Sequence, residues 1–226
     1  MPAKPRGRFL VLEGVDGAGT TTQTTELARR LTARGVRVST TAEPSRGPVG
    51  LLLRLALARR LTGAEGRPFD RAALALLFAA DRLDHVASAV LPRLAEGTWV
   101  ISDRYVLSSL AYQTLDVPVA FVSQINGRAP APDLTLFLEV PPDVALRRRR
   151  AEQPEAELFE QLPLQRRIAA NYRRAIASGS QGGLGGEVDV LDGTRSIGEV
   201  ADEIERTIVK RFKLDRSASK RSGIGR

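Results

Sequence analysis

A glycine-rich turn between an apolar run and a helical stretch constrains this chain most strongly. Residues 8–13 form an apolar run that stops at Gly14, and residues 19–34 follow with Leu27 and Leu31 at helical spacing. A short apolar run is typical of a buried strand, and the spaced leucines mark one face of a helix. Glycines at such a junction allow backbone angles that are closed to other residues, so successive amide groups can point inward. The segment therefore predicts a strand–loop–helix unit whose loop presents N–H groups.

The rest of the chain continues this alternation. Further strands are expected at Val36–Thr41, Thr98–Ser102, Leu134–Val140 and Glu187–Leu191. Further helices are expected at Gly50–Leu61, Asp70–Leu94, Pro142–Ala151, Pro163–Ala177 and Ile197–Phe212. Strands separated by helices imply crossover connections and a parallel sheet. We therefore predict an α/β fold with a five-stranded parallel sheet flanked by helices on both faces.

Composition narrows the class of protein. The chain has 226 residues, 42% hydrophobic and 27% charged, and no cysteine. This composition is that of one globular domain and excludes a disordered chain or a disulfide-stapled scaffold. The longest apolar stretches, such as Ala72–Ala80, are far shorter than the ~20 residues that cross a bilayer. Because no apolar leader precedes the first motif, we expect a cytoplasmic protein without a membrane partner.

The positive charge is concentrated at the C-terminus. The net charge is +8, and residues 210–226 hold seven basic residues against one aspartate, which accounts for six of these charges. We expect a single domain over residues 1–212, followed by a basic, disordered tail over residues 213–226. A tail that binds nucleic acid is the less favoured alternative, because the body of the chain is nearly neutral.

The segment Gly14–Thr21 nearly matches the phosphate-binding loop pattern G-x-x-x-x-G-K-[ST]. Gly14, Gly19 and Thr21 stand at three of its fixed positions, whereas Thr20 stands at the lysine. The loop amides and the helix N-terminus can hold a phosphate without that lysine. The lysine contributes charge to phosphoryl transfer, and losing one such group costs on the order of 10²–10³ in rate. A tight strand-to-helix turn without a ligand is the plain alternative.

A second polar segment directly follows the third predicted strand. Ligands bind outside the carboxyl ends of the strands in a parallel sheet, so Asp103 and Arg104 should emerge beside the glycine loop. Arginine can grip a phosphate with two parallel hydrogen bonds. If the following residues are helical, Ser108, Ser109 and Tyr112 would line a neighbouring pocket. The alternative is a surface ion pair worth about 0–1 kcal/mol.

These segments together resemble the thymidylate kinase family over residues 8–210. The resemblance is carried by Glu13–Gly19, Glu43-Pro44, Phe78–Arg82, Asp103–Gln113 and Pro132–Leu138. It implies the P-loop kinase fold with a short lid at about residues 147–162. It also implies transfer of the γ-phosphoryl group of ATP to dTMP, giving dTDP and ADP in dTTP synthesis. Mg²⁺ as the cofactor and a homodimer are implied as well.

The resemblance also implies roles for individual residues. Asp16, Asp103 and Arg104 would be catalytic, and Thr21 would approach the metal. ATP would be bound by Gly14, Val15, Asp16, Gly17, Ala18, Gly19, Thr20 and Thr21. The residues implied to bind dTMP are Arg54, Phe78, Arg82, Arg104, Ser108, Ser109 and Tyr112. Among these, Phe78 would stack on thymine, Arg82 would contact its carbonyl edge, and Arg104 would clamp the acceptor phosphate with Arg54 as a second contact.

The chain departs from the family pattern on the ATP side. Besides Thr20, the lid has Leu158 at the nearest match to a family arginine. Arg148 or Arg150 could replace the lost charges and bind ATP. The sequence leaves open an active kinase, a catalytically weak or inactive nucleotide-binding relative, and a kinase for another nucleotide. We expect His85, the one histidine, to be a helix-surface residue without catalytic work.

Overall fold

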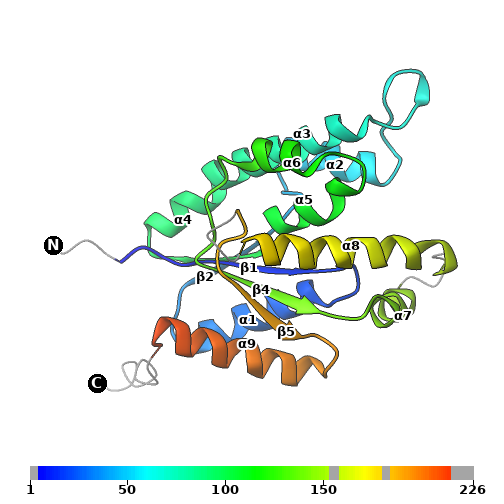
Figure 1. Cartoon of the computed structure of the whole chain (residues 1–226). Coiled ribbons are helices and arrows are strands. Elements are labelled where there is room, and N and C mark those ends of the chain that lie inside the picture. Colours follow the sequence, from blue (N-terminus) through cyan, green and yellow to red (C-terminus); the bar gives the residue numbers. More distant parts are fainter. Residues whose placement is uncertain (1–4, 153–157, 180–183, 215–226) are drawn as a thin grey trace, which may run out of the picture.

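The computed structural model describes residues 5–152, 158–179 and 184–214, and these build one parallel sheet covered by helices (Figure 1). The strands lie in the order β2-β3-β1-β4-β5. Their bounds are β1 Phe9–Gly14, β2 Val38–Ala42, β3 Trp99–Asp103, β4 Leu134–Glu139 and β5 Val188–Asp192. All four pairings are parallel, so the predicted fold class is confirmed.

Helices cover both faces of this sheet. In Figure 1, α1 and α9 lie below it, α5 and α8 lie above it, and α2, α3 and α6 form the outer part of the upper side. The bounds are α1 Thr20–Ala33, α2 Pro48–Leu57, α3 Arg71–His85, α4 Leu91–Ala95, α5 Val106–Tyr112, α6 Val119–Asn126, α7 Pro142–Glu152, α8 Leu158–Gly179 and α9 Ile197–Phe212. Short 3₁₀ turns occupy Ala64–Gly66 and Gln113–Leu115.

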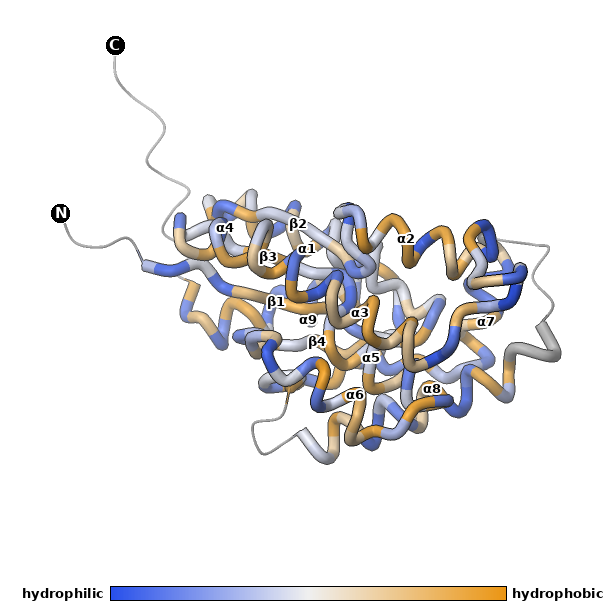
Figure 2. Tube along the Cα trace, turned by 90° about the horizontal axis from the view of Figure 1, so that it is seen from above, coloured by the Kyte–Doolittle hydropathy of each residue, from blue (hydrophilic) through white to orange (hydrophobic). Residues whose placement is uncertain are grey.

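The core follows from the apolar strands at the centre of the sheet. Every residue of β1 is buried, and β4 is buried except at its last residue. A strand covered on both faces reads as a continuous apolar run, as residues 9–12 do. Figure 2 shows the apolar colouring along β1. The one charged residue of this strand, Glu13, is therefore a buried exception.

The strand register sets which residues share the carboxyl edge. Asp103 at the end of β3 lies opposite Leu12 of β1 on one side and opposite Ala42 of β2 on the other. Gly14 ends β1 opposite Leu138 of β4. The segments that follow β1, β2 and β3 are therefore brought to one rim, at the right of Figure 1.

Three local predictions differ from the structure. Helix α6 was not predicted, because its eight residues are too few to show clear helical periodicity. The expected helix over residues 70–94 has a π-helical turn at Val86–Val90 between α3 and α4. Pro92 lacks an N–H for a regular helical bond, which accounts for the wider turn before it. The helix expected to begin at Pro163 is α8, which begins at Leu158 and contains Pro163 in its second turn.

Two predicted segments fall partly outside the described residues. Residues 153–157 of the expected lid over 147–162 are not described, and the described ends of that stretch belong to α7 and α8. Residues 215–226 of the expected tail are likewise outside the description. The lid, the disordered tail and the 1–212 domain boundary stay predictions.

Candidate active site

The loop between β1 and α1 depends on left-handed glycine backbone. Gly17 has φ 88° and Gly19 has φ 92°, which residues with a Cβ rarely adopt. A Cβ on Gly17 would lie 2.2 Å from the carbonyl oxygen of Ala145 in α7. Gly19 is the N-cap of α1, and this helix end has no side-chain cap. Its first N–H groups, at the positive end of the helix dipole, suit an anion such as phosphate.

The two threonines at the start of α1 have different surroundings. Thr20, at the lysine position of the pattern, is buried, whereas Thr21 is exposed. The Thr21 hydroxyl donates to Oδ2 of Asp103 at 2.5 Å. Oδ1 of Asp103 is buried and has no hydrogen-bond partner among the described residues. The sequence therefore places a hydroxyl and a carboxylate with an unsatisfied oxygen beside the loop.

This pair fits Mg²⁺ by its chemistry. Mg²⁺ prefers oxygen ligands and is commonly held by one or two protein side chains together with substrate phosphates and water. Thr21 and Asp103 offer the two side-chain oxygens, and Oδ1 of Asp103 has no hydrogen-bond partner among the described residues. No group of three or more His, Cys, Asp or Glu residues that could hold a metal occurs within the described residues.

Arg104 and the glycine loop are in direct contact. Nη2 of Arg104 donates to Oδ1 of Asp16 at 2.7 Å, and Nη1 donates to the carbonyl oxygen of Gly14 at 3.0 Å. The Tyr112 hydroxyl donates to the same Asp16 oxygen at 2.9 Å. Burial raises the pKa of Tyr112, so this hydroxyl stays a donor at neutral pH. The expectation that the loop and Arg104 share one edge of the sheet is confirmed.

The backbone at Arg104 is held in an uncommon conformation. Its φ is 72°, in the left-handed region, at a cost of about 1–3 kcal/mol for a residue with a side chain. The Arg104 N–H donates to the carbonyl oxygen of Leu12 at 2.9 Å. The Ser102 hydroxyl donates to the Arg104 carbonyl oxygen at 2.8 Å. These bonds hold the turn after β3 and keep the Arg104 side chain, which is 22% exposed, beside the loop.

The arginine run at the end of α7 reaches the loop through a residue that was not predicted. Arg149 Nη1 lies 3.3 Å from Oδ2 of Asp16. Arg148 instead donates to the carbonyl oxygens of Gly193 and Thr194 at 2.7 and 2.9 Å, and Arg150 is exposed. The buried Ala145 and Leu146 set the rotation of α7, which four consecutive arginines cannot reveal by themselves. The ATP contacts of Arg148 and Arg150 stay predictions.

The residues expected at the thymine lie on α3, and one of them is fully engaged with the protein. Phe78 is half-buried, whereas the Arg82 side chain is only 2% exposed. The Arg82 guanidinium donates to Glu43 at 2.8 Å, to the Ser109 hydroxyl at 3.0 Å, to the Tyr105 carbonyl at 3.2 Å and to the side chain of Asn126. The predicted contact of Arg82 with a base would therefore compete with these partners.

Apart from Arg54, the other residues predicted to bind dTMP lie either beside Arg104 or beside Arg82. Ser108 lies 3.2 Å from Arg104 Nη1, on the same face of α5 as Tyr112. Ser109, one residue on, is buried against Arg82 and does not face Arg104. Arg54 on α2 is exposed and donates to the carbonyl oxygens of Pro44 and Ser45. The structure thus joins Ser108 and Tyr112 to the loop and Arg104, and joins Ser109 to the Arg82 cluster.

The prediction of a surface His85 was wrong. Its side chain is 5% exposed, with Nε2 2.6 Å from the Thr41 hydroxyl and Nδ1 3.3 Å from Oε1 of Glu43. Glu43 follows β2 directly and faces both Arg82 and His85. Because this carboxylate lies beneath α3, the polar face of the helix turns inward there, contrary to the usual orientation.

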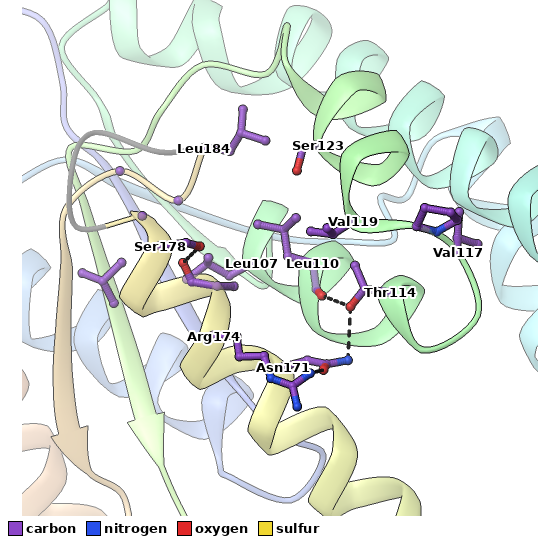
Figure 3. A pocket seen from close by; sticks show the side chains of 16 residues that line it. Leu107, Leu110, Thr114, Val117, Val119, Ser123, Asn171, Arg174, Ser178 and Leu184 are labelled. Carbon is purple, nitrogen blue, oxygen red and sulfur yellow. Dashed lines mark hydrogen bonds between the residues drawn. The ribbon is translucent and has the colours of Figure 1, made fainter.

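A cavity of about 650 Å³ lies between α5, α6 and α8, separate from the loop (Figure 3). Leu107 and Leu110 of α5 line it, together with Val119 and Asn171. Asn171 donates to the Thr114 hydroxyl at 3.1 Å, so its amide is partly satisfied there. Since Ser108 faces Arg104 while Leu107 faces the cavity, α5 forms a wall between the two places.

Two residues at the centre of the contact network had no role in the sequence-based prediction. The buried carboxylate of Glu13 and the buried hydroxyl of Tyr172 on α8 lie 3.0 Å apart, and the same hydroxyl lies 3.4 Å from Arg104 Nη1. A carboxylate inside an otherwise apolar strand was the available signal for Glu13. Tyr172 offered a weaker one, a tyrosine on the core face of a helix, whose hydroxyl needs a partner when buried.

Comparison with known proteins decides the family. A sequence model described as thymidylate kinase matches residues 12–204. A protein of Pyrococcus abyssi named probable thymidylate kinase is 38% identical over 200 residues, which cover 88% of this chain and 94% of the relative. A protein of Pyrobaculum calidifontis with the same name is 40% identical over 198 residues, covering 87% and 93%. The chain belongs to the thymidylate kinase family.

Membership of the thymidylate kinase family confirms the resemblance inferred from the motifs. It supports a nucleotide-binding phosphotransferase on a P-loop kinase fold, and the contacts between Asp16 and Arg104 join the two motifs that carried the assignment. Within the described residues, no helix is both long and apolar enough to span a bilayer.

Proposed function

We propose that this member of the family is a working dTMP kinase that uses ATP. A 5′-phosphate oxygen of dTMP attacks the γ-phosphorus of ATP, the bond to the bridging oxygen breaks, and ADP leaves with that electron pair. The observation that carries the proposal is the contact of Arg104 with Asp16 and the Gly14 carbonyl. An arginine beside the glycine loop supports the proposal, because a guanidinium can bind a phosphate held there.

On the donor side, main-chain groups do most of the binding. The amides of residues 14–21 would surround the ATP phosphates, and the start of α1 adds its free N–H groups. On the acceptor side, Arg104 would grip the dTMP phosphate with Arg54 as a second contact, and Ser108 and Tyr112 would line the pocket. Asp16, which already accepts from Tyr112, would meet the acceptor sugar. Phe78 would stack on the thymine.

Mg²⁺ is the cofactor that we propose for this reaction. Thr21 and Asp103 would hold it together with ATP phosphates, and Mg²⁺ bound there would neutralise charge on those phosphates. EDTA in excess over Mg²⁺ is expected to abolish the formation of dTDP, and added Mg²⁺ to restore it. Turnover that continues in EDTA would contradict a role for the metal.

Two arginines of the described residues could supply the charge that Thr20 lacks. Arg149 already lies against Asp16, and the guanidinium of Arg104 lies on the other oxygen of the same carboxylate. Two cations therefore flank the loop on the side where the phosphoryl group would pass. We infer that they sustain slow transfer without the loop lysine, which favours an active enzyme over an inactive relative.

Replacing Thr20 by lysine is expected to raise kcat with dTMP about tenfold or more, because a cation then faces the transferring phosphoryl group. A coupled assay that follows ADP formation with ATP, Mg²⁺ and dTMP measures this. Thr22→Lys is the matched control, because it adds the same charge at an exposed position one residue beyond Thr21. A wild-type chain without turnover, and a T20K variant that stays inactive, would favour the nucleotide-binding relative.

We also propose that the protein is a homodimer that works in the cytoplasm. Large apolar side chains are exposed on α2, α3 and α6, namely Leu51, Leu52, Leu57, Leu76 and Val119. Figure 2 shows the apolar stretches along α2. Sedimentation equilibrium should give about twice the chain mass of 24.5 kDa, and a mass of one chain would contradict the dimer. Cell fractionation tests the location.

A further inference from the structure

Glu13 is a buried carboxylate that the proposed chemistry does not use. It is the fifth residue of β1, and its side chain is 0% exposed. A charge in such a position is costly unless hydrogen bonds satisfy it. Strand β1 ends one residue after Glu13, where the phosphate-binding loop begins. The paired strand β3 ends just before Arg104.

Four donors converge on the two carboxylate oxygens of Glu13. Oε1 accepts the backbone N–H groups of Tyr105 at 2.8 Å and Ser108 at 3.1 Å. Oε2 accepts the hydroxyls of Ser108 at 2.6 Å and Tyr172 at 3.0 Å. Each of these partners is a donor, so both oxygens act as acceptors, as in an ionised carboxylate, while burial raises the pKa of Glu13 above its ordinary value.

The first consequence concerns the backbone of Arg104. Its left-handed conformation, φ 72°, needs support from both neighbouring peptide groups. Leu12, just before Glu13, accepts the Arg104 N–H at 2.9 Å, and Glu13 itself accepts the next N–H, that of Tyr105. Consecutive residues of β1 therefore fix the turn from which the guanidinium projects.

The second consequence concerns the guanidinium itself. Arg104 Nη1 lies 3.2 Å from the Ser108 oxygen and 3.4 Å from the Tyr172 oxygen. Both hydroxyls lie within donating distance of Glu13 and 2.8 Å from each other, and a hydroxyl that donates to the carboxylate leaves its oxygen lone pairs free to face the arginine. Burial raises the pKa of Tyr172, which keeps its hydroxyl a donor. The carboxylate thereby decides the direction of two hydrogen bonds that orient Arg104.

We propose that Glu13 is a positioning residue for the acceptor phosphate. By accepting four hydrogen bonds it holds the turn at Arg104 and orients the Ser108 and Tyr172 hydroxyls as acceptors for the guanidinium. It does not touch the substrate. The inference rests on the proposed role of Arg104 as the clamp on the dTMP phosphate.

The test is Glu13→Gln in the full chain, read by titration calorimetry of dTMP and of ATP separately. The NH₂ group of the new glutamine would face a hydrogen-bond donor where Glu13 now offers an acceptor, so the turn at Arg104 loses part of its support. The Kd for dTMP is therefore expected to rise about 10- to 100-fold, while the Kd for ATP changes less than about threefold. Tyr172→Phe removes one of the donors and should weaken dTMP binding by a smaller factor. It serves as the second variant if Glu13→Gln does not fold.

A double-mutant cycle separates positioning from general destabilisation. In an Arg104→Ala background, Glu13→Gln is expected to weaken dTMP binding by less than about twofold, because the group that it positions is gone. Glu139→Gln is the matched control, since it alters an exposed carboxylate at the end of β4. Equal losses for both nucleotides, or additive effects in the cycle, would overturn the inference.

These binding measurements do not depend on turnover. If the wild-type chain binds dTMP but transfers no phosphoryl group, the proposed activity fails while the role of Glu13 is still tested. If the wild-type chain binds ATP and not dTMP, Arg104 is no acceptor clamp and the role of Glu13 falls with it.

Discussion

Arg104→Ala is expected to lower kcat/KM for dTMP roughly 10²–10³-fold, about 3–4 kcal/mol of transition-state stabilisation. Arg104 contacts Asp16 and the Gly14 carbonyl, so its removal takes away the cation nearest the loop. Arg104→Lys should recover only part of this loss, because lysine cannot make two parallel hydrogen bonds to one phosphate. Steady-state kinetics with dTMP as the varied substrate measures both variants.

Arg29→Ala provides the control for Arg104→Ala. Arg29 is an exposed arginine of α1 that pairs with Glu26 three residues earlier, and it lies outside both the loop and the predicted lid. Its replacement should leave kcat/KM within about twofold, since exposed pairs contribute little. An Arg104→Ala variant as active as this control would show that another group holds the acceptor phosphate.

Gly17→Ala is expected to weaken ATP binding about tenfold or more and to lower the melting temperature. An alanine at φ 88° is strained by roughly 1–2 kcal/mol. Its Cβ would also lie 2.2 Å from the Ala145 oxygen, so either the loop or α7 must move. Calorimetry with ATP and thermal unfolding report the two effects.

Gly19→Ala separates the two causes. Gly19 has nearly the same backbone angle, φ 92°, but a Cβ there would meet no atom within 4 Å. This variant therefore carries the strain without the clash with α7, and should lose less ATP affinity than Gly17→Ala. Equal losses in the two variants would mean that contact between the loop and α7 does not shape the donor site.

The sheet and the loop could be predicted because their signals are local. The apolar run before Gly14 and the glycine spacing after it determine a strand and a turn, and parallel strands then bring Asp103 and Arg104 to the same edge. The carboxyl ends of β1, β2 and β3 meet at this edge regardless of which helices cover the faces of the sheet. The contact between Arg104 and Asp16 follows from that topology together with the long reach of an arginine side chain.

The parts that could not be predicted depend on how helices rotate and pack. The orientation of α7 decides that Arg149, rather than Arg148 or Arg150, reaches Asp16. The inward polar face of α3 buries Arg82 and His85 against Glu43, a partner 39 to 42 residues away in sequence. The hydrophobic periodicity of a helix cannot reveal such a burial, because the polar partner, Glu43, lies at the end of a separate strand.

The most direct test incubates ATP that carries ³²P at the γ-phosphate with dTMP, Mg²⁺ and the wild-type protein, and follows the label. We expect labelled dTDP, formed faster from dTMP than labelled product is formed from dCMP. Label that stays in ATP or appears only as inorganic phosphate, while both nucleotides raise the melting temperature of the protein, would contradict it.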